Sequence, residues 1–239
     1  MTYDPSSTRP MTATTDKVVD AGLQAHMRSV YNNMTWGLAV TGATAFGIAN
    51  FAPLYNLVTT GPLYWILAFA PLAFLWFGLS PAKLLRMDAG KARSMFVLFC
   101  VLMGASMASI FAVYTGASVA RVFFITAATF ASMSLFGYTT KKDLSGMGHF
   151  MMMGMVGIFF AMIFNMFIES TMIHFVISGL GVIIFTALTA WETQTIKETY
   201  AVAHGRETNE KLAVIGALTL YMCFINLFQF LMSFMGQRD

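Results

Sequence analysis

The chain has 239 residues, of which 57% are hydrophobic and 10% charged, and its net charge is +3. Ordinary soluble domains carry about 25% charged residues, and a soluble fold of this size needs more polar surface than this chain supplies. The composition therefore excludes a typical soluble enzyme, a disordered protein and a disulfide scaffold. The two cysteines, Cys100 and Cys223, lie inside apolar runs, and we interpret both as free thiols. The class that remains is a polytopic, all-α membrane protein.

Residues 1–28 form a polar segment that is rich in Thr and Ser. They lack the basic start, the apolar run and the small-residue cleavage site of a signal peptide. We expect a mobile cytoplasmic tail here, with a helix from about residue 18 to residue 29. A transmembrane domain is expected over residues 29–239, and its first helix would act as an uncleaved insertion signal.

Seven apolar runs are long enough to cross a hydrocarbon core of about 30 Å, which takes about 20 residues of helix. The predicted spans are residues 30–49, 63–79, 95–115, 119–138, 147–168, 172–191 and 212–235. Because the connections between them are short, we expect neighbours in sequence to pack as antiparallel pairs. A topology with six spans, in which the last helix is re-entrant or one loop is buried, stays open as an alternative.

Small residues recur at helical spacing in two of these spans. The third span has Gly104, Ala108 and Ala112, and the fifth has Gly154, Gly157 and Ala161. Lipid offers no hydrophobic drive for helices to associate, so small side chains that let backbones approach are typical of helix interfaces. We interpret both stripes as packing faces.

The basic residues alternate between the two sides of the membrane. One side holds Arg9, Lys17, Arg28, Lys83, Arg86, Lys91, Arg93, Lys141, Lys142, Lys197, Arg206 and Lys211, and the other holds Arg121 and Arg238. Lys and Arg favour the cytoplasmic side. We therefore predict a cytoplasmic N-terminus and, with seven spans, a C-terminus on the opposite side.

The sequence has none of the common catalytic motifs, and we expect no enzyme activity and no resident cofactor. There is no H-E-x-x-H, G-x-S-x-G, P-loop or G-x-G-x-x-G. The histidines lack the i, i+4 spacing of metal ligands, and we interpret each as interfacial or solvated: His26, His149, His174 and His204. We predict no metal site from these residues.

Ionisable groups near or inside the spans are the remaining candidates, because such groups are costly in lipid and often functional. Arg121 can reach the outer interface with its long side chain. Glu169 ends the fifth span, and Asn165 one turn earlier is predicted to share its face and to line an outer vestibule. Glu192 at the inner end of the sixth span has two interpretations of equal weight. It is a carboxylate reaching water, paired with Lys197 or with the basic 83–93 loop, or it is a cation or proton ligand at the mouth of a pore.

The last span carries a polar stripe made of Thr219, Cys223, Asn226 and Ser233. Their offsets of about four and seven residues place them on one helix face. Such a face points into the bundle or toward a water-filled cavity. Either the stripe makes hydrogen bonds between helices, with Asn226 foremost, or it lines a conduit along a central seventh helix.

Five stretches, in this order, resemble the Bax inhibitor-1 family of membrane proteins in its bacterial form. They are LQAHMRSVYNNM (23–34), FGYTTKKDLS (136–145), NMFIES (165–170), FTALTAWETQTIK (185–197) and GALTLYMCFINLF (216–228). The resemblance covers nearly the whole chain. It implies a seven-helix bundle in which the last helix is central and surrounded by the other six.

The resemblance also implies a function, because members of this family are linked to a pH-gated calcium leak. That gating is attributed to two aspartates, one at the inner end of the sixth helix and one in the seventh. Two close carboxylates cannot both ionise cheaply, and both can bind a hard cation. The matching positions here are Glu192 and Cys223. A thiol is a poor ligand for Ca²⁺, so the chain keeps half of this sensor, and at most weak Ca²⁺ binding is expected.

Two functions follow as hypotheses from different classes. The first is a slow leak pathway for Ca²⁺ or another cation along the seventh helix, with a degenerate sensor formed by Glu192, Cys223 and Asn226. The second is a non-catalytic membrane partner, since some bacterial relatives restrain a membrane-bound ATP-dependent protease. That role needs no ion ligand. Apart from the lipid bilayer and such a protein, no partner and no nucleic acid is expected.

Overall fold

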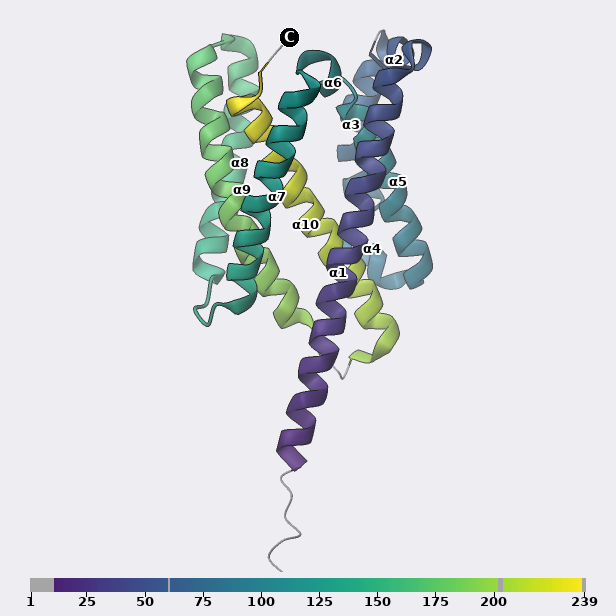
Figure 1. Ribbon diagram of the computed structural model, residues 1–239, viewed down its shortest axis with the longest axis vertical. Coiled ribbons are helices and arrows are strands. Elements are labelled where there is room, and N and C mark those ends of the chain that lie inside the picture. Colours follow the sequence, from purple (N-terminus) through teal and green to yellow (C-terminus); the bar gives the residue numbers. More distant parts are fainter. Residues whose placement is uncertain (1–10, 60, 202–203, 238–239) are drawn as a thin grey trace, which may run out of the picture.

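The structure is a computed structural model, and it describes residues 11–59, 61–201 and 204–237. The described residues form helices and no strand. The helices are α1 (Met11–Asn50), α2 (Ala52–Thr59), α3 (Pro62–Phe77), α4 (Pro81–Arg86), α5 (Ala89–Met107), α6 (Ile110–Val113), α7 (Gly116–Thr139), α8 (Ser145–Ile168), α9 (Thr171–Thr199) and α10 (Gly205–Met235). The predicted all-α membrane bundle is confirmed (Figure 1).

Each predicted span coincides with a helix, with local differences at the ends. Five helices are long and apolar enough to cross a membrane, and α1 together with α2 makes a sixth candidate with a bend of 103°. The second predicted span, α3, has 16 residues and is shorter than the others. The third is broken after Met107, where a turn separates α5 from α6, so a single continuous helix there was a wrong expectation.

Side chains at the helix ends explain several of these boundaries. The Thr115 hydroxyl accepts a hydrogen bond from the Ser118 N–H (3.1 Å) and caps α7. Ser170 caps α9 in the same way through the Ile173 N–H (3.4 Å). Both supply a partner to an otherwise unsatisfied N–H of the first helical turn. Between them, Glu169 ends α8 in the left-handed region with a φ of 55°.

The last helix, α10, is the centre of the bundle. Fourteen of its residues are buried, whereas the peripheral α8 buries two, Gly148 and Ile158. It packs against α9, α1, α7 and α5. In contrast, α8 packs mainly against α9, and α3 packs mainly against α5. The predicted central position of the last helix is therefore confirmed, with four spans as its principal neighbours and two in an outer layer.

Helices adjacent in sequence are not always the closest neighbours. The partner of α1 is α5, and that of α7 is α9. Glycines explain this pairing, since a Cβ on Gly104 of α5 would lie 2.6 Å from the Thr41 carbonyl oxygen of α1. Gly137 of α7 lies in equally direct contact with the Ala190 backbone of α9. Helices that can approach closely at a glycine therefore pair in preference to helices that follow one another in the chain. The expectation that neighbours in sequence form antiparallel pairs was wrong for α7 and α8.

The two small-residue stripes have different roles. Gly104 packs against α1, as expected, and a Cβ on Gly154 would lie 2.8 Å from Ile184 of α9. Gly157 has nothing within 4 Å of such a Cβ, so it faces outward and takes no part in packing. The side chain of Ala112 lies outside the described residues.

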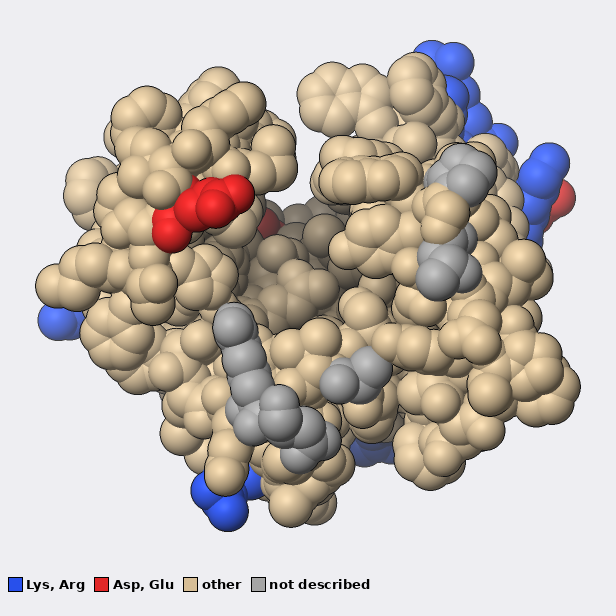
Figure 2. Space-filling view, turned by 90° about the horizontal axis from the view of Figure 1, so that it is seen from above, with Lys and Arg blue, Asp and Glu red and all other residues tan. Residues whose placement is uncertain are grey.

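The two ends of the bundle differ in charge. We call the end with α4 and the α7–α8 turn the basic end, and the opposite end the C-terminal end. α1 extends well past the basic end, because its 40 residues span about 60 Å (Figure 1). Seen from the C-terminal end, the molecule is hollowed near its middle and has few charged side chains, mostly at the rim (Figure 2).

The helical part of the N-terminal tail begins at Met11, earlier than predicted, and residues 1–10 lie outside the described residues.

Candidate functional site

Glu192 and Cys223 lie together where α9 meets α10. Cys223 is 5% exposed, and its thiol lies near the Thr189 side chain and the Glu192 carboxyl. Glu192 is half-buried and faces the central helix. The structure therefore brings together the two positions that the family resemblance singles out, although their role as a sensor stays a prediction.

The Glu192 carboxylate has no cationic partner among the described residues. Its expected partner, Lys197, instead donates a hydrogen bond to the Tyr138 carbonyl oxygen (2.9 Å). The Lys197 ammonium also lies over the Tyr138 ring, 5.6 Å from its centroid. The ion pairs of the described chain, Arg206–Glu210 and Lys211–Glu207, both lie within the first turns of α10. Glu192 is thus a carboxylate within a predicted membrane helix that no neighbouring cation neutralises.

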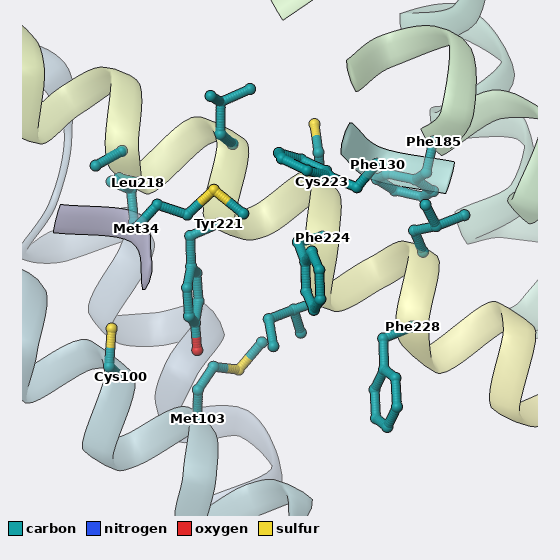
Figure 3. Close-up of a cluster of buried hydrophobic side chains, with 14 of the residues drawn as sticks. Met34, Cys100, Met103, Phe130, Phe185, Leu218, Tyr221, Cys223, Phe224 and Phe228 are labelled. Carbon is teal, nitrogen blue, oxygen red and sulfur yellow. The ribbon is translucent and has the colours of Figure 1, made fainter. Parts of the chain in front are cut away.

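A tightly packed apolar core surrounds this position. In Figure 3 Cys223 lies beside Phe130 of α7 and Phe185 of α9, with Phe224 and Phe228 farther along α10. The Phe130 and Phe224 rings meet edge to face with their centroids 5.5 Å apart. Cys223 therefore lies among aromatic side chains from three helices, α7, α9 and α10.

The polar stripe of α10 divides into two kinds of contact. Thr219 and Asn226 donate to carbonyl groups of their own helix, at Ile215 (3.1 Å) and Met222 (2.8 Å). The expectation that Asn226 links helices was therefore wrong. Ser233 does reach α9, with its Oγ 2.6 Å from His174 Nε2 and 3.1 Å from Ser178 Oγ. Cys223 and Ser233 thus both face α9, ten residues apart along α10.

The outer pair, Asn165 and Glu169, lies at the C-terminal end of α8. Asn165 accepts the backbone hydrogen bond of the Glu169 N–H (2.8 Å), and its buried side-chain oxygen has no partner among the described residues. Glu169 is exposed. Both are far along the helix from the Glu192 level, so the structure does not join them to the predicted sensor.

Sequence reasoning missed a buried hydroxyl cluster on the other side of α10. The Thr41 hydroxyl lies 2.7 Å from the Tyr221 hydroxyl and 3.0 Å from the Cys100 carbonyl oxygen. Tyr221 extends from α10 toward α5, between Cys100 and Met103 (Figure 3). Tyr221 falls within one of the stretches that carry the family resemblance, and this was the available signal.

A second missed residue is Gln194, two positions after Glu192. Its amide accepts from the Leu144 N–H (2.8 Å) and donates to the Lys142 carbonyl oxygen (2.9 Å), so it fastens the α7–α8 turn to α9. In the same turn, hydrogen bonds from the Ser145 side chain and N–H hold the pKa of Asp143 below its usual range. Gln194 therefore connects the α7–α8 turn to the helix that carries Glu192.

We expected every histidine to be interfacial or solvated, and His26 differs from this expectation. His26 of α1 is buried at 6% exposure, with its ring centroid 5.3 Å from that of Tyr200, and its Nε2 has no partner among the described residues. His174 bonds Ser233 as described. The described residues contain no group of three His, Cys, Asp or Glu side chains placed to hold a metal ion.

Comparison with known proteins identifies the family. Residues 23–239 match the family described as "Inhibitor of apoptosis-promoting Bax1". Uncharacterized protein RP147 of Rickettsia prowazekii is 39% identical over 97% of this chain and 98% of its own. A Caulobacter vibrioides protein is 42% identical over 92% of both chains, and the inner membrane protein YbhL of Escherichia coli K12 is 40% identical over 91% and 94%. The chain is therefore a multi-pass membrane protein that belongs to the Bax inhibitor-1 family.

Proposed function

We propose that the protein is a slow cation leak pathway whose conduit follows α10, with Glu192 as the carboxylate that binds the permeating cation or a proton. The observation that carries this proposal is the position of Glu192 within a membrane helix, against the central helix and without a cationic partner among the described residues. A carboxylate in a membrane helix is costly, so an unneutralised one indicates a functional group.

The groups around Glu192 indicate which cation the proposed leak would favour and how fast it would be. Carboxylate oxygen suits a hard cation such as Ca²⁺, whereas the neighbouring Cys223 thiol is a poor ligand for it. Because α10 is buried along most of its length, conduction requires it to shift against its neighbours, which is in keeping with a slow leak. With a thiol at position 223 there is no pair of adjacent carboxylates to titrate near neutral pH, so we expect the leak to depend only weakly on pH.

The test is cation flux through the purified protein in liposomes, measured for Ca²⁺ and K⁺ with the Glu192→Gln variant. Glu198→Gln is the matched control, because Glu198 lies on the same helix and is exposed. We expect Glu192→Gln to change the flux at least severalfold and Glu198→Gln to leave it unaltered. Equal flux in empty liposomes, the unmodified protein and both variants contradicts the proposal.

A second candidate is a non-catalytic partner of a membrane-bound ATP-dependent protease. The favouring observation is α1, which has 40 residues and extends past the basic end as a continuous helix (Figure 1). By analogy with YbhL, an inner membrane protein, we place the chain in the bacterial inner membrane. The alternating basic residues support a cytoplasmic position for the extension of α1.

Turnover of a substrate of such a protease separates the two candidates. If the protein restrains the protease, its deletion accelerates turnover, and the Glu192→Gln variant restores the slower rate as well as the unmodified protein does. A variant without residues 1–20 should fail to restore it while still inserting in the membrane. Unchanged turnover on deletion contradicts this second role.

A further inference from the structure

A narrow apolar groove runs between α1 and α7 in the C-terminal half of the bundle. Its volume is about 290 Å³. One wall is α1 and the other is the first turns of α7, with the central helix α10 as the floor. The lining used below consists of Gly42, Ala45, Ala120, Phe124, Phe224 and Phe228.

The groove exists because α1 and α7 both pack against α10 but hardly touch each other. The principal partner of α1 is α5 and that of α7 is α9, so the two helices diverge around the central one. In Figure 1, α10 is visible in the opening between them. Small residues on both walls, Gly42 and Ala120, leave the space unfilled, and a Cβ on Gly42 would have nothing within 4 Å.

The open side of this groove faces the hydrocarbon of the bilayer. Phe124, on its rim, is 71% exposed although it belongs to a membrane-spanning helix. Water does not fill an apolar cavity, and an empty one forfeits the dispersion contacts of its lining. A helix from another chain, which is about 10–12 Å wide with its side chains, does not fit within a volume of about 290 Å³. A single alkyl chain is the apolar group of the bilayer that fits.

The α7 wall of the groove has one cation next to it in sequence, Arg121, which does not itself line the groove. It lies about 60° around the helix from Phe124, beyond the rim, so its long side chain would have to reach back to a phosphate held there. Its side chain is exposed and forms no ion pair within the described part of the chain. A guanidinium binds phosphate oxygens in a bidentate manner.

We propose that the groove between α1 and α7 is a phospholipid site, in which one acyl chain lies against α10 and the phosphate binds Arg121. This site is separate from Glu192 and does not depend on ion conduction. Because the acyl chain lies between two helices that contact the central one, its occupancy stabilises the arrangement of α1, α7 and α10 described above.

The test uses the full chain in vesicles that contain a phospholipid with a photoreactive group on one acyl chain. After illumination, labelled peptides are mapped by mass spectrometry. We expect labelling to concentrate on residues 38–45 of α1 and 116–124 of α7, above the level on the outward face of α8. Even labelling of all lipid-facing helices overturns the proposal.

Two glycines of α1 give a matched pair of variants. Gly42→Leu fills the groove, whereas Gly47→Leu adds the same side chain at a position that is equally open but outside the groove. We expect loss of groove labelling with Gly42→Leu and unchanged labelling with Gly47→Leu. Ala120→Leu obstructs the same space from α7 and should reproduce the loss, which guards against misfolding of one variant.

The role of Arg121 has its own readout. Arg121→Gln should reduce labelling by the phospholipid probe but not by a photoreactive diacylglycerol, which has no phosphate. If Arg121→Gln affects neither probe, the phosphate part of the proposal is wrong. If illumination instead joins two copies of the chain through the groove, the occupant is a second copy and the lipid site is overturned.

Discussion

The hydroxyls of Thr41 and Tyr221 lie 2.7 Å apart in the buried core, although 180 residues separate them in the chain. The same Thr41 hydroxyl is 3.0 Å from the carbonyl oxygens of Gly37 and Cys100. A hydroxyl has one proton to donate, so Tyr221 donates to Thr41 and Thr41 donates to a backbone carbonyl. One small side chain thereby connects α1, α5 and α10 at the centre of the bundle.

Removing either hydroxyl should destabilise the bundle modestly. Tyr221→Phe and Thr41→Val are each expected to lower the free energy of unfolding by about 1 kcal/mol, the usual size of a hydrogen bond in a protein and near the upper range inside membranes. The measurement is reversible unfolding in detergent for both variants and for their combination. Because the two groups share one bond, the double variant should cost less than the two single costs together. Strict additivity would show that the hydroxyls do not interact.

Gly104 should tolerate no side chain, in contrast to Gly157. Gly104→Ala places a methyl group 2.6 Å from the Thr41 carbonyl oxygen and forces α1 away from α5. Such overpacking typically costs about 1–3 kcal/mol. Gly157→Ala meets nothing within 4 Å and should be neutral or stabilising by about 0.5–1 kcal/mol. Thermal unfolding of the two variants compares them directly, and equal melting temperatures contradict the packing of α5 on α1 described above.

The membrane helices and the central position of α10 could be predicted from the sequence, whereas the pairing of the helices could not. Length and hydropathy located the membrane helices, and the resemblance placed α10 at the centre, because both depend on the apolar character of whole segments. Hydropathy carries no information about which helices touch, so the pairing of α7 with α9 through Gly137 could not be predicted. The polar stripe likewise predicted which residues share one face of α10, but not the hydrogen-bond partners of those residues. Asn226 bonds its own helix, while Ser233 bonds His174, and only the structure distinguishes these.

Replacing Cys223 with Asp should create or strengthen a pH-dependent leak. The new carboxylate would stand next to Glu192, and two adjacent carboxylates can hold a cation or share a proton. The measurement is Ca²⁺ flux in liposomes at pH 6, 7 and 8 for the unmodified protein and for Cys223→Asp, with correct folding checked by its elution and melting profile. We expect weak flux with little pH dependence from the unmodified protein. Robust pH-dependent flux from it would show that the thiol does not impair the site.

The C-terminus should lie on the side of the membrane opposite the N-terminus. The last residues of the described chain are held at the C-terminal end, where the Gln237 N–H donates to Ser118 Oγ (2.9 Å). The basic residues gather at the other end, which favours the cytoplasm. A reporter enzyme that works only outside the cytoplasm should be active when fused after Asp239 and inactive when fused before Met1. The reverse activities would contradict the orientation, and the same activity at both ends would contradict the odd number of spans.

Gln194 should control access to the α7–α8 turn. Gln194→Ala removes both hydrogen bonds that fasten this turn to α9, and the exposed Lys141 and Lys142 are sites for trypsin. We expect several times faster cleavage there than in the unmodified protein. Thr195→Ala serves as the control, because the Thr195 hydroxyl bonds only the Trp191 carbonyl oxygen of its own helix among the described residues. Equal cleavage rates for the two variants would mean that Gln194 does not hold the turn.

The short helix α3 has a consequence for the surrounding bilayer. Its 16 residues reach about 24 Å, less than an average hydrocarbon thickness of about 30 Å. Trp65 and Trp76 lie near its two ends and are largely exposed, and tryptophan prefers the level of the lipid headgroups. Lipids next to α3 must therefore thin or tilt to match it, which makes hydrophobic mismatch a property of this one side of the protein. Bilayers of short-chain lipids relieve that mismatch at α3, whereas the 24 to 31 residues of α7, α8, α9 and α10 suit thicker membranes.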